Sequence, residues 1–408
     1  MRTRPREPVP PSGPDRPSRN GSDMTLPTSH RSRGPAVPNF TNALNDFMSR
    51  PDEPETLQLL TPEGTLLTAP EETPGYDPEL LRVLYRDMVM SRGFDTEATA
   101  LQRQGELGLW PPLAGQEAAQ VGSAHALRPD DYVFPSYREH GVAWCRGVDP
   151  VDVVKLYRGV TNGGWDPRKS NFHLYTLVVG SHTLHATGYA MSLTKKGSDA
   201  VAVAYFGDGA SSEGDVAEAF TFAAVHDAPV LFFCQNNQWA ISEPVTRQLR
   251  GPLYRRAHGY GFPGVRVDGN DALAVHAVTR FALDHIRNGN GPFLVEAFTY
   301  RMGAHTTSDD PTRYRAQSEL EQWRARDPIT RLRLHLTETG HATPEFFEEV
   351  DEQARELAHR VRREVRAMPN SPQLTIFDHV YAEGHAVVDE ERRQFQEYHR
   401  SFADPESE

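Results

Sequence analysis

Two short polar segments in the middle of the chain contain residue types that bind a metal ion and a phosphate. One segment begins Gly207-Asp208-Gly209-Ala210, and the other reads Asn236-Asn237-Gln238-Trp239. Glycines let backbone amides approach a phosphate closely. A carboxylate such as Asp208 repels a phosphate unless a hard cation lies between them, and Mg²⁺ with oxygen ligands suits that place. We therefore expect Asp208, the Asn237 side-chain oxygen and a backbone carbonyl near Trp239 to hold Mg²⁺ beside a diphosphate.

Either segment alone is weak evidence, because Gly-Asp-Gly is usually a turn and paired asparagines usually lie in a loop. Together they are more specific, since each follows a predicted strand and 29 residues separate Asp208 from Asn237. In an open parallel α/β sheet, ligands bind beyond the carboxyl ends of the strands. The pair resembles the signature of thiamine-diphosphate-binding proteins, in which Gly-Asp-Gly is followed, one helix later, by Asn-Asn.

The elements that must position these segments alternate along the centre of the chain. Strands are predicted at 200–206, 229–234 and 292–297, because each is a continuous apolar run of strand length. Helices are predicted between them at 213–225 and 271–286. The alternation predicts an α/β fold with a doubly wound, mainly parallel sheet and helices on both faces.

Composition divides the chain into four regions. Residues 1–38 are rich in Pro, Arg, Ser and Gly, which predicts a disordered tail. A transit peptide or a true start at Met24 are the alternatives. An N-terminal arm is expected at 39–75, the thiamine-diphosphate-binding α/β domain at 76–320, and a helical C-terminal extension at 321–408.

The overall composition excludes several classes of protein. A formal net charge of −13 over 408 residues argues against nucleic-acid binding, which needs Lys and Arg to neutralise phosphates. The two cysteines, Cys145 and Cys234, lack the spacing of a disulfide framework or a zinc site. No apolar run approaches the roughly 20 residues of a membrane span. We expect a cytoplasmic protein with neither a nucleic-acid nor a membrane partner.

Further segments narrow the resemblance to the alpha subunits of 2-oxoacid dehydrogenases, over residues 82–381. Residues 133–141 resemble the family segment in which Tyr and Arg bind the cofactor phosphates. The resemblance gives that role to Tyr137 and Arg138, and a guanidinium offers the forked donors that phosphate oxygens accept. The alternative for Arg138 is a surface ion pair with Glu139.

The run Leu177-Val178-Val179 resembles the loop that lies under the thiazolium ring of the cofactor. The resemblance implies that the backbone of Leu177 and Val179 contacts the cofactor, and that the Val179 side chain holds it in a bent conformation. Two histidines follow this loop. We expect His182 to support the site from behind, because the family often has Gln there, and His185 to pack against other elements.

The segment Tyr300–Asp310 follows a predicted strand and resembles the active-site loop of the family. The resemblance implies that His305 faces the reacting centre, where an imidazole can donate to a substrate oxygen near neutral pH. Thr306 stands where animal relatives carry a phosphorylated serine, so the resemblance leaves open whether this loop is regulated in that way.

The resemblance implies oxidative decarboxylation of a 2-oxoacid, with the branched-chain type as the nearest match. Thiamine diphosphate and magnesium are the expected cofactors, and the acyl group is expected to pass to lipoyl groups of an acyltransferase component. Leu109 and Trp110 align with pocket positions of branched-chain members, so the substrate is expected to contact them, Tyr137 and His305.

The chain contains only one diphosphate-type half and no second sheet domain is predicted after residue 320. A separate beta subunit is therefore expected to complete the site in an α2β2 heterotetramer. The alternatives are the alpha subunit of a pyruvate or acetoin dehydrogenase, and a non-catalytic diphosphate-binding scaffold. The complete set of predicted site residues weighs against the scaffold.

Overall fold

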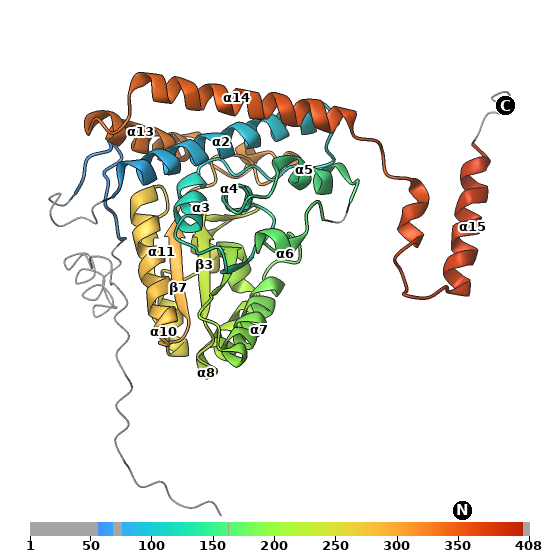
Figure 1. The fold of residues 1–408 in the computed structure, drawn as a ribbon, viewed down its shortest axis with the longest axis horizontal. Coiled ribbons are helices and arrows are strands. Elements are labelled where there is room, and N and C mark those ends of the chain that lie inside the picture. Colours follow the sequence, from blue (N-terminus) through green and yellow to red (C-terminus); the bar gives the residue numbers. More distant parts are fainter. Residues whose placement is uncertain (1–55, 68–75, 162, 403–408) are drawn as a thin grey trace, which may run out of the picture. The chain divides into compact units, whose positions relative to one another are not determined.

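A five-stranded sheet lies at the centre of the computed structural model, which describes residues 56–67, 76–161 and 163–402 (Figure 1). Neighbouring strands all run parallel, in the order β1-β2-β3-β7-β6. The strands are β1 (Tyr132–Phe134), β2 (Ala202–Gly207), β3 (Val230–Asn236), β6 (Gly264–Asp268) and β7 (Phe293–Phe298). The predicted tail at 1–38 and most of the predicted arm at 39–75 lie outside the described residues.

The three strands predicted from apolar runs are β2, β3 and β7, the central strands of the sheet. The edge strands β1 and β6 were not predicted. β1 has only three residues, and β6 alternates buried Val265 and Val267 with half-buried Arg266 and Asp268. Such strands lack the continuous apolar run that burial on both faces produces.

The helices complete the fold between and after the strands. The longer ones are α2 (Pro78–Arg103), α3 (Glu117–Ala124), α4 (His140–Cys145), α5 (Pro150–Arg158), α7 (Ser181–Lys196), α8 (Gly214–Val225), α10 (Arg255–Tyr260), α11 (Ala272–Arg287), α12 (Gln317–Arg324), α13 (Pro328–Glu338), α14 (Pro344–Ala367) and α15 (Ala386–Arg400). The short elements are α6 (Pro167–Ser170), α9 (Val245–Gln248), the 3₁₀ turns at Asp208–Ser212, Pro311–Arg313 and Gln373–Phe377, and a hairpin of β4 (Trp239–Ala240) and β5 (Glu243–Pro244).

Each face of the sheet has its own hydrophobic core, because successive strand residues point to opposite faces. On one face, Tyr205 and Phe233 belong to a cluster that includes residues of α2, α3 and α11. On the other face, Phe206 and Phe232 belong to a cluster that includes residues of α7 and α8. Helices therefore cover both faces, and the predicted doubly wound parallel α/β fold is confirmed.

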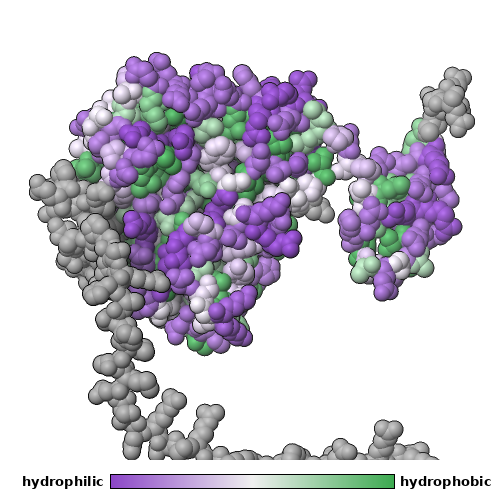
Figure 2. Space-filling view, viewed as in Figure 1, coloured by the Kyte–Doolittle hydropathy of each residue, from purple (hydrophilic) through white to green (hydrophobic). Residues whose placement is uncertain are grey.

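The helix α14 packs along α2 with one apolar face (Figure 1). Its buried residues recur every three or four positions, which places them on one side of the helix: Phe347, Val350, Ala354, Leu357, Val361 and Val365. A Cβ at Gly93 of α2 would lie 3.2 Å from the Ala354 Cβ, so the two helices approach closely there. Hydrophilic side chains dominate the visible surface over α14 (Figure 2).

Side-chain caps fix several helix starts. Asp271, at the start of the helix predicted at 271–286, accepts from the backbone of Leu273 and Ala274 at 3.1 Å and also from the backbone of Leu59 and Leu60. The same carboxylate thus begins α11 and fastens the segment before α2 to the sheet region. Within residues 321–402 the elements are helical. In the described part of the chain, no helix is long and apolar enough to cross a membrane.

Candidate functional site

A cavity of about 480 Å³ opens where β2 and β3 end, a volume typical of sites for small molecules. The predicted site residues that line it are Leu109, Tyr137, Arg138, Leu177, Val179, Gly207, Asp208, Gly209, Ala210, Asn237, Trp239 and His305. Segments far apart in the sequence therefore converge on one space. Trp110 is the predicted residue that does not line the cavity.

The register of the sheet brings the two polar segments together. β2 and β3 are parallel neighbours, with Gly207 opposite Gln235, so Asp208 and Asn237 both follow the same edge of the sheet. Both side chains are buried. The Asn237 amide donates to Gln116 Oε1 at 3.2 Å, which fixes the orientation of its side-chain oxygen.

The surroundings of Asp208 suit a cation and a phosphate. Burial raises the pKa of its carboxyl to about 6, and its side-chain donor is the Gln248 amide at 3.2 Å. Burial outweighs the hydrogen bonds and the Arg301 charge that favour the carboxylate, so a cation beside it would stabilise its charge. A Cβ at Gly207 would meet no atom within 4 Å, whereas one at Gly209 would meet Ala240 at 2.8 Å. Gly207 thus leaves room for a ligand, and Gly209 is needed for the close approach of the β4–β5 hairpin.

The carbonyl oxygen of Trp239, the third predicted metal ligand, accepts a hydrogen bond from Arg301 Nη1 at 3.0 Å. Arg301 also donates to the Ile241 carbonyl at 2.7 Å, and it is fully buried. A carbonyl oxygen has two lone pairs, so one remains for a further ligand. Arg301 was not predicted, although it stands four residues before His305 in the segment that was singled out.

Arg138 is buried, and its hydrogen bonds join two loop segments. Its Nη1 donates to the Pro112 carbonyl at 2.6 Å, and its Nη2 donates to the His305 carbonyl at 2.9 Å. Its side chain is 5% exposed, so the alternative of a surface ion pair with Glu139 is wrong. The guanidinium lies in the cavity wall, where it can also face a ligand.

His305 is held as a neutral imidazole. Arg138 Nη2 and Arg301 Nη1 lie 3.3 Å and 3.2 Å from its Nδ1. Burial, followed by the charges of these two arginines, lowers the pKa of His305 to about 3. Its backbone N–H donates to Asp309 Oδ2 at 2.9 Å, which fixes the loop. The residue is therefore suited to donate a hydrogen bond to a substrate oxygen rather than to carry a positive charge.

The loop under the predicted ring position is unusually exposed. Leu177 is 61% exposed and Val178 is 71% exposed, although both are apolar. Val179 is 40% exposed and lines the cavity together with Leu177. Another apolar residue on this rim is Ile241, which is 57% exposed. One side of the cavity is thus an apolar surface that the described residues of the chain do not cover.

Two further predictions need correction. Trp110 is fully buried, donates to Asp95 Oδ1 at 2.8 Å and stacks on His140 at 4.2 Å, so it supports the wall instead of contacting a substrate. His182, expected to support the site from behind, is fully buried with Nε2 2.7 Å from the Tyr205 carbonyl, and it also borders the cavity. His185, expected to pack, is exposed.

A buried network of amides was missed by sequence reasoning. Gln235 receives a bond from Gln120 at 2.9 Å and donates to Glu139 at 2.6 Å, and Ser136 donates to the other Glu139 oxygen at 2.9 Å. Burial raises the pKa of Glu139 to about 7. Gln120 also donates to the Arg138 carbonyl. The network fixes the backbone that carries Arg138. The segment 133–141 was predicted from the sequence to be part of the site, but the hydrogen bonds within this network were not.

Together, the doubly wound sheet and a cavity with a carboxylate, an amide and arginines at its strand ends define an α/β protein with a ligand site beyond the carboxyl ends of its strands. The model of the family "Dehydrogenase E1 component" matches residues 85–376, which is more than half of the 408 residues. The chain belongs to this family and is an oxidoreductase that acts on 2-oxoacids.

Relatives agree with the family and differ in their substrates. The chain is 47% identical over 330 residues to the 3-methyl-2-oxobutanoate dehydrogenase subunit alpha of Mycobacterium tuberculosis, covering 81% of this chain and 90% of the relative. It is 39% identical over 314 residues to the pyruvate dehydrogenase E1 component subunit alpha of Staphylococcus aureus, covering 76% and 84%. The resemblance to alpha subunits predicted from the motifs is confirmed.

Proposed function

We propose that this chain is the alpha subunit of a branched-chain 2-oxoacid dehydrogenase that uses thiamine diphosphate and Mg²⁺. The observation that carries the proposal is the convergence of Asp208, Asn237, Arg138 and His305 on one cavity. When bound, the cofactor would supply the electron sink for loss of carbon dioxide. The side chains described above would bind and orient the cofactor and the substrate, and would exclude water from the site.

Asp208 and the Asn237 oxygen are the proposed side-chain ligands of Mg²⁺, with the Trp239 carbonyl as a backbone ligand. All are hard oxygen donors, which Mg²⁺ prefers. Two features support this assignment: the high pKa of Asp208 caused by its burial, and the open space beside Gly207. Arg138 would face the diphosphate, and Tyr137 would lie between it and the substrate.

A beta subunit is proposed to cover the open side of the cavity. The exposed apolar residues Leu177, Val178 and Ile241 support this, because apolar surface beside a site that must exclude water is costly in solvent. The assembly would be an α2β2 heterotetramer that passes its acyl group to the lipoyl groups of an acyltransferase component. A cytoplasmic location remains part of the proposal.

The branched-chain substrate is proposed from the relative named for 3-methyl-2-oxobutanoate, which is more similar to this chain than the pyruvate relative is. Leu109 lines the cavity beside Tyr157 and would contact the aliphatic end of the substrate. His305 would donate its Nε2 hydrogen to the substrate oxygen. Pyruvate is the second candidate, because of the 39% identical relative that is named for it.

The test is carbon-dioxide release by the chain co-expressed with its beta partner, measured for 3-methyl-2-oxobutanoate and pyruvate at equal concentrations. The proposal expects the highest kcat/KM for the branched-chain acid, and dependence on both thiamine diphosphate and Mg²⁺. The chain alone should release no carbon dioxide. A higher kcat/KM for pyruvate would reassign the substrate, and activity of the chain alone would remove the beta subunit from the site.

A further inference from the structure

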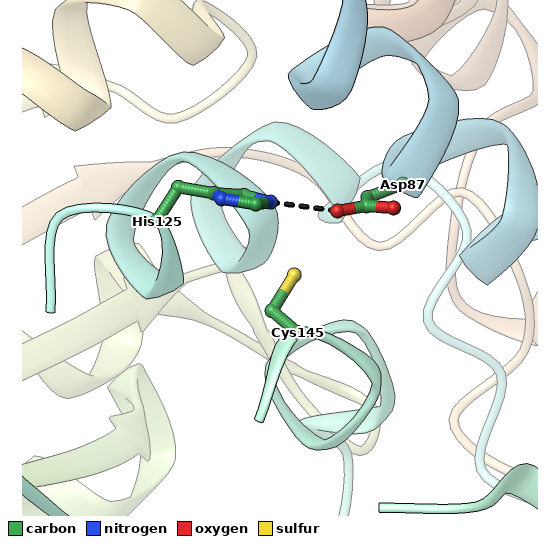
Figure 3. A group of neighbouring side chains, drawn as sticks. All are labelled: Asp87, His125 and Cys145. Carbon is green, nitrogen blue, oxygen red and sulfur yellow. Dashed lines mark hydrogen bonds and ion pairs between the residues drawn. The ribbon is translucent and has the colours of Figure 1, made fainter. Parts of the chain in front are cut away.

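Three potential metal ligands of different chemistry meet outside the cofactor cavity. Asp87 of α2, His125 at the end of α3 and Cys145 at the end of α4 each place one ligand atom within 4.8 Å of the other two (Figure 3). Asp87 Oδ2 lies 2.7 Å from His125 Nε2. The Cys145 sulfur is directed toward the space between the carboxylate and the imidazole (Figure 3). None of the three lines the cofactor cavity.

The carboxylate is prepared to act as a ligand. Burial disfavours its charge, but hydrogen bonds from His125 and Trp144 outweigh burial and hold the pKa of Asp87 below its ordinary value. Trp144 Nε1 donates to Oδ1 at 3.0 Å, which leaves Oδ2 directed at the imidazole. Two arginines act on the cluster: Arg86 Nε lies 3.6 Å from Asp87 Oδ1, and the charge of Arg146 acts on the Cys145 thiol.

The arrangement differs from that of a nucleophilic cysteine. Burial, with the Asp87 charge, raises the pKa of the Cys145 thiol well above its ordinary value, so the thiol is not activated for attack. A catalytic imidazole also uses its two ring nitrogens for different partners, whereas here one nitrogen faces both Asp87 and the sulfur. A metal ion requires one position that all three ligand atoms can reach.

We propose that Asp87, His125 and Cys145 bind one Zn²⁺, with water as the fourth ligand. Thiolate, imidazole and carboxylate are the ligands of zinc, and sulfur with nitrogen selects a transition metal over Mg²⁺. In a tetrahedral zinc site, ligand atoms lie roughly 3.3–3.6 Å apart. Sulfur must therefore move inward, and the carboxylate and imidazole must separate slightly.

Zinc binding changes both the protonation and the net charge of the cluster. Binding releases one proton from the Cys145 thiol, and the imidazole hydrogen that Nε2 donates to Asp87 must move to Nδ1 so that Nε2 can become the ligand. The thiolate and carboxylate together neutralise Zn²⁺, so the loaded cluster is neutral, whereas the empty cluster carries the single negative charge of Asp87. A surface groove lined by Asp87, Trp144 and Leu357 reaches one of the three ligands, while His125 and Cys145 do not line it.

The ion would fasten α2, α3 and α4 together beside the cofactor site. α4 begins at His140, two residues after Arg138, and His140 Nε2 lies 3.0 Å from the Pro111 carbonyl of the cavity wall. The ligands lie 38 and 20 positions apart along the chain, a spacing that predicts no zinc site from the sequence.

The first experiment uses the full chain, with any histidine tag removed, stripped with a chelator and titrated with Co²⁺ in excess Mg²⁺. Cobalt bound to a thiolate gives a ligand-to-metal charge-transfer band that carboxylates and the 17 histidines of the chain cannot give. The proposal expects the band to saturate at one equivalent and to disappear when Zn²⁺ is added. Absence of the band at saturating cobalt would overturn it.

Matched variants locate the ligands. Cys145→Ser should abolish the band, and His125→Gln should weaken cobalt binding at least tenfold. Cys234→Ala is the control, because Cys234 is the other cysteine and lies buried in β3. A band that survives Cys145→Ser, or that is lost only in Cys234→Ala, contradicts the proposal.

A measurement on the unmodified sequence covers the case in which a variant fails to fold. Zn²⁺ should slow alkylation of Cys145 by iodoacetamide at least tenfold. Mass spectrometry of the peptide that contains Cys145 measures this rate. Cys234 is the internal reference, and its rate should not respond to Zn²⁺. An unchanged Cys145 rate at a zinc concentration that saturates the protein would exclude the site.

Discussion

Arg138 contacts His305 at two points, with Nη2 3.3 Å from the imidazole Nδ1 and 2.9 Å from the backbone oxygen. Arg301 Nη1 lies 3.2 Å from the same Nδ1. Because a guanidinium is only a donor, Nδ1 must accept and the ring proton must lie on Nε2. Arg138, which stands 167 positions before His305, and Arg301 thus set the tautomer of the histidine assigned to the substrate.

Replacement of His305 by Ala should reduce kcat roughly 100-fold or more in the enzyme assembled with its beta subunit, as expected for a positioned donor. Cofactor affinity, measured by calorimetry, should change far less. The exposed His359 on α14 provides the control as His359→Ala, which should keep full turnover. Turnover of His305→Ala within a factor of three of the wild type would make His305 an ordinary loop residue.

Replacement of Asp208 by Asn keeps the shape of the side chain but removes its charge from the proposed Mg²⁺ site. We expect Mg²⁺-dependent affinity for thiamine diphosphate to fall at least tenfold, which is about 1.4 kcal/mol. Calorimetry on the assembled enzyme measures this. Asp227→Asn makes the same change at an exposed residue outside the cavity and should leave the affinity unchanged. Equal affinities for both variants would refute the metal assignment.

Replacement of Asp95 by Asn should loosen the wall segment that carries Leu109. The buried Asp95 carboxylate accepts from Trp110 Nε1 at 2.8 Å, from the Leu113 backbone at 3.0 Å and from the Ala114 backbone at 3.3 Å. An amide has only one acceptor oxygen, so one or more donors lose their partner.

We expect Asp95→Asn to lower the free energy of unfolding by about 1–3 kcal/mol, as for a buried polar group left unpaired. KM for the 2-oxoacid should rise as well. Urea denaturation and steady-state kinetics give the two values, and Asp284→Asn on the exposed side of α11 is the matched control. A variant as stable as the control would show that the three bonds contribute little.

The free energy of unfolding should decrease in mild acid because the folded chain buries neutral histidines. His276 is one of them, and its contribution can be tested separately. Burial, with the charges of Arg280 and His125, lowers its pKa from 6.5 to about 4. The unfolded chain therefore binds a proton below about pH 6.5, while the native ring stays neutral until about pH 4. Stability from this ring is complete above the unfolded pKa and is lost as the pH falls toward the folded one.

At about pH 5.5 the loss attributable to His276 is about 1 kcal/mol relative to neutral pH. His276→Gln cannot titrate, so its free energy of unfolding should decrease less between these conditions than that of the wild type. His359→Gln at an exposed site should behave as the wild type does. An identical acid sensitivity in His276→Gln would contradict the shifted pKa.

Local sequence patterns determined the central strands and the segments that follow them. β2, β3 and β7 were recognisable because burial on both faces demands continuous apolar runs. Asp208 and Asn237 were predicted to be neighbours because parallel strands end at the same edge of a sheet. The Asp271 cap and the start of α14 at Thr343-Pro344 also follow from local rules.

Tertiary packing decided contacts that the spacing of residues along the sequence does not predict. The sequence gives no reason for Arg138 and Arg301 to meet at one nitrogen of His305, for Trp110 to turn into the core, or for Cys145 to face Asp87. Each depends on how helices and loops from distant parts of the chain pack against the sheet, and contacts of that range are fixed only when the whole core is assembled. The polar segments thus determined the chemistry of the cavity, and packing determined which protons and ligands face one another.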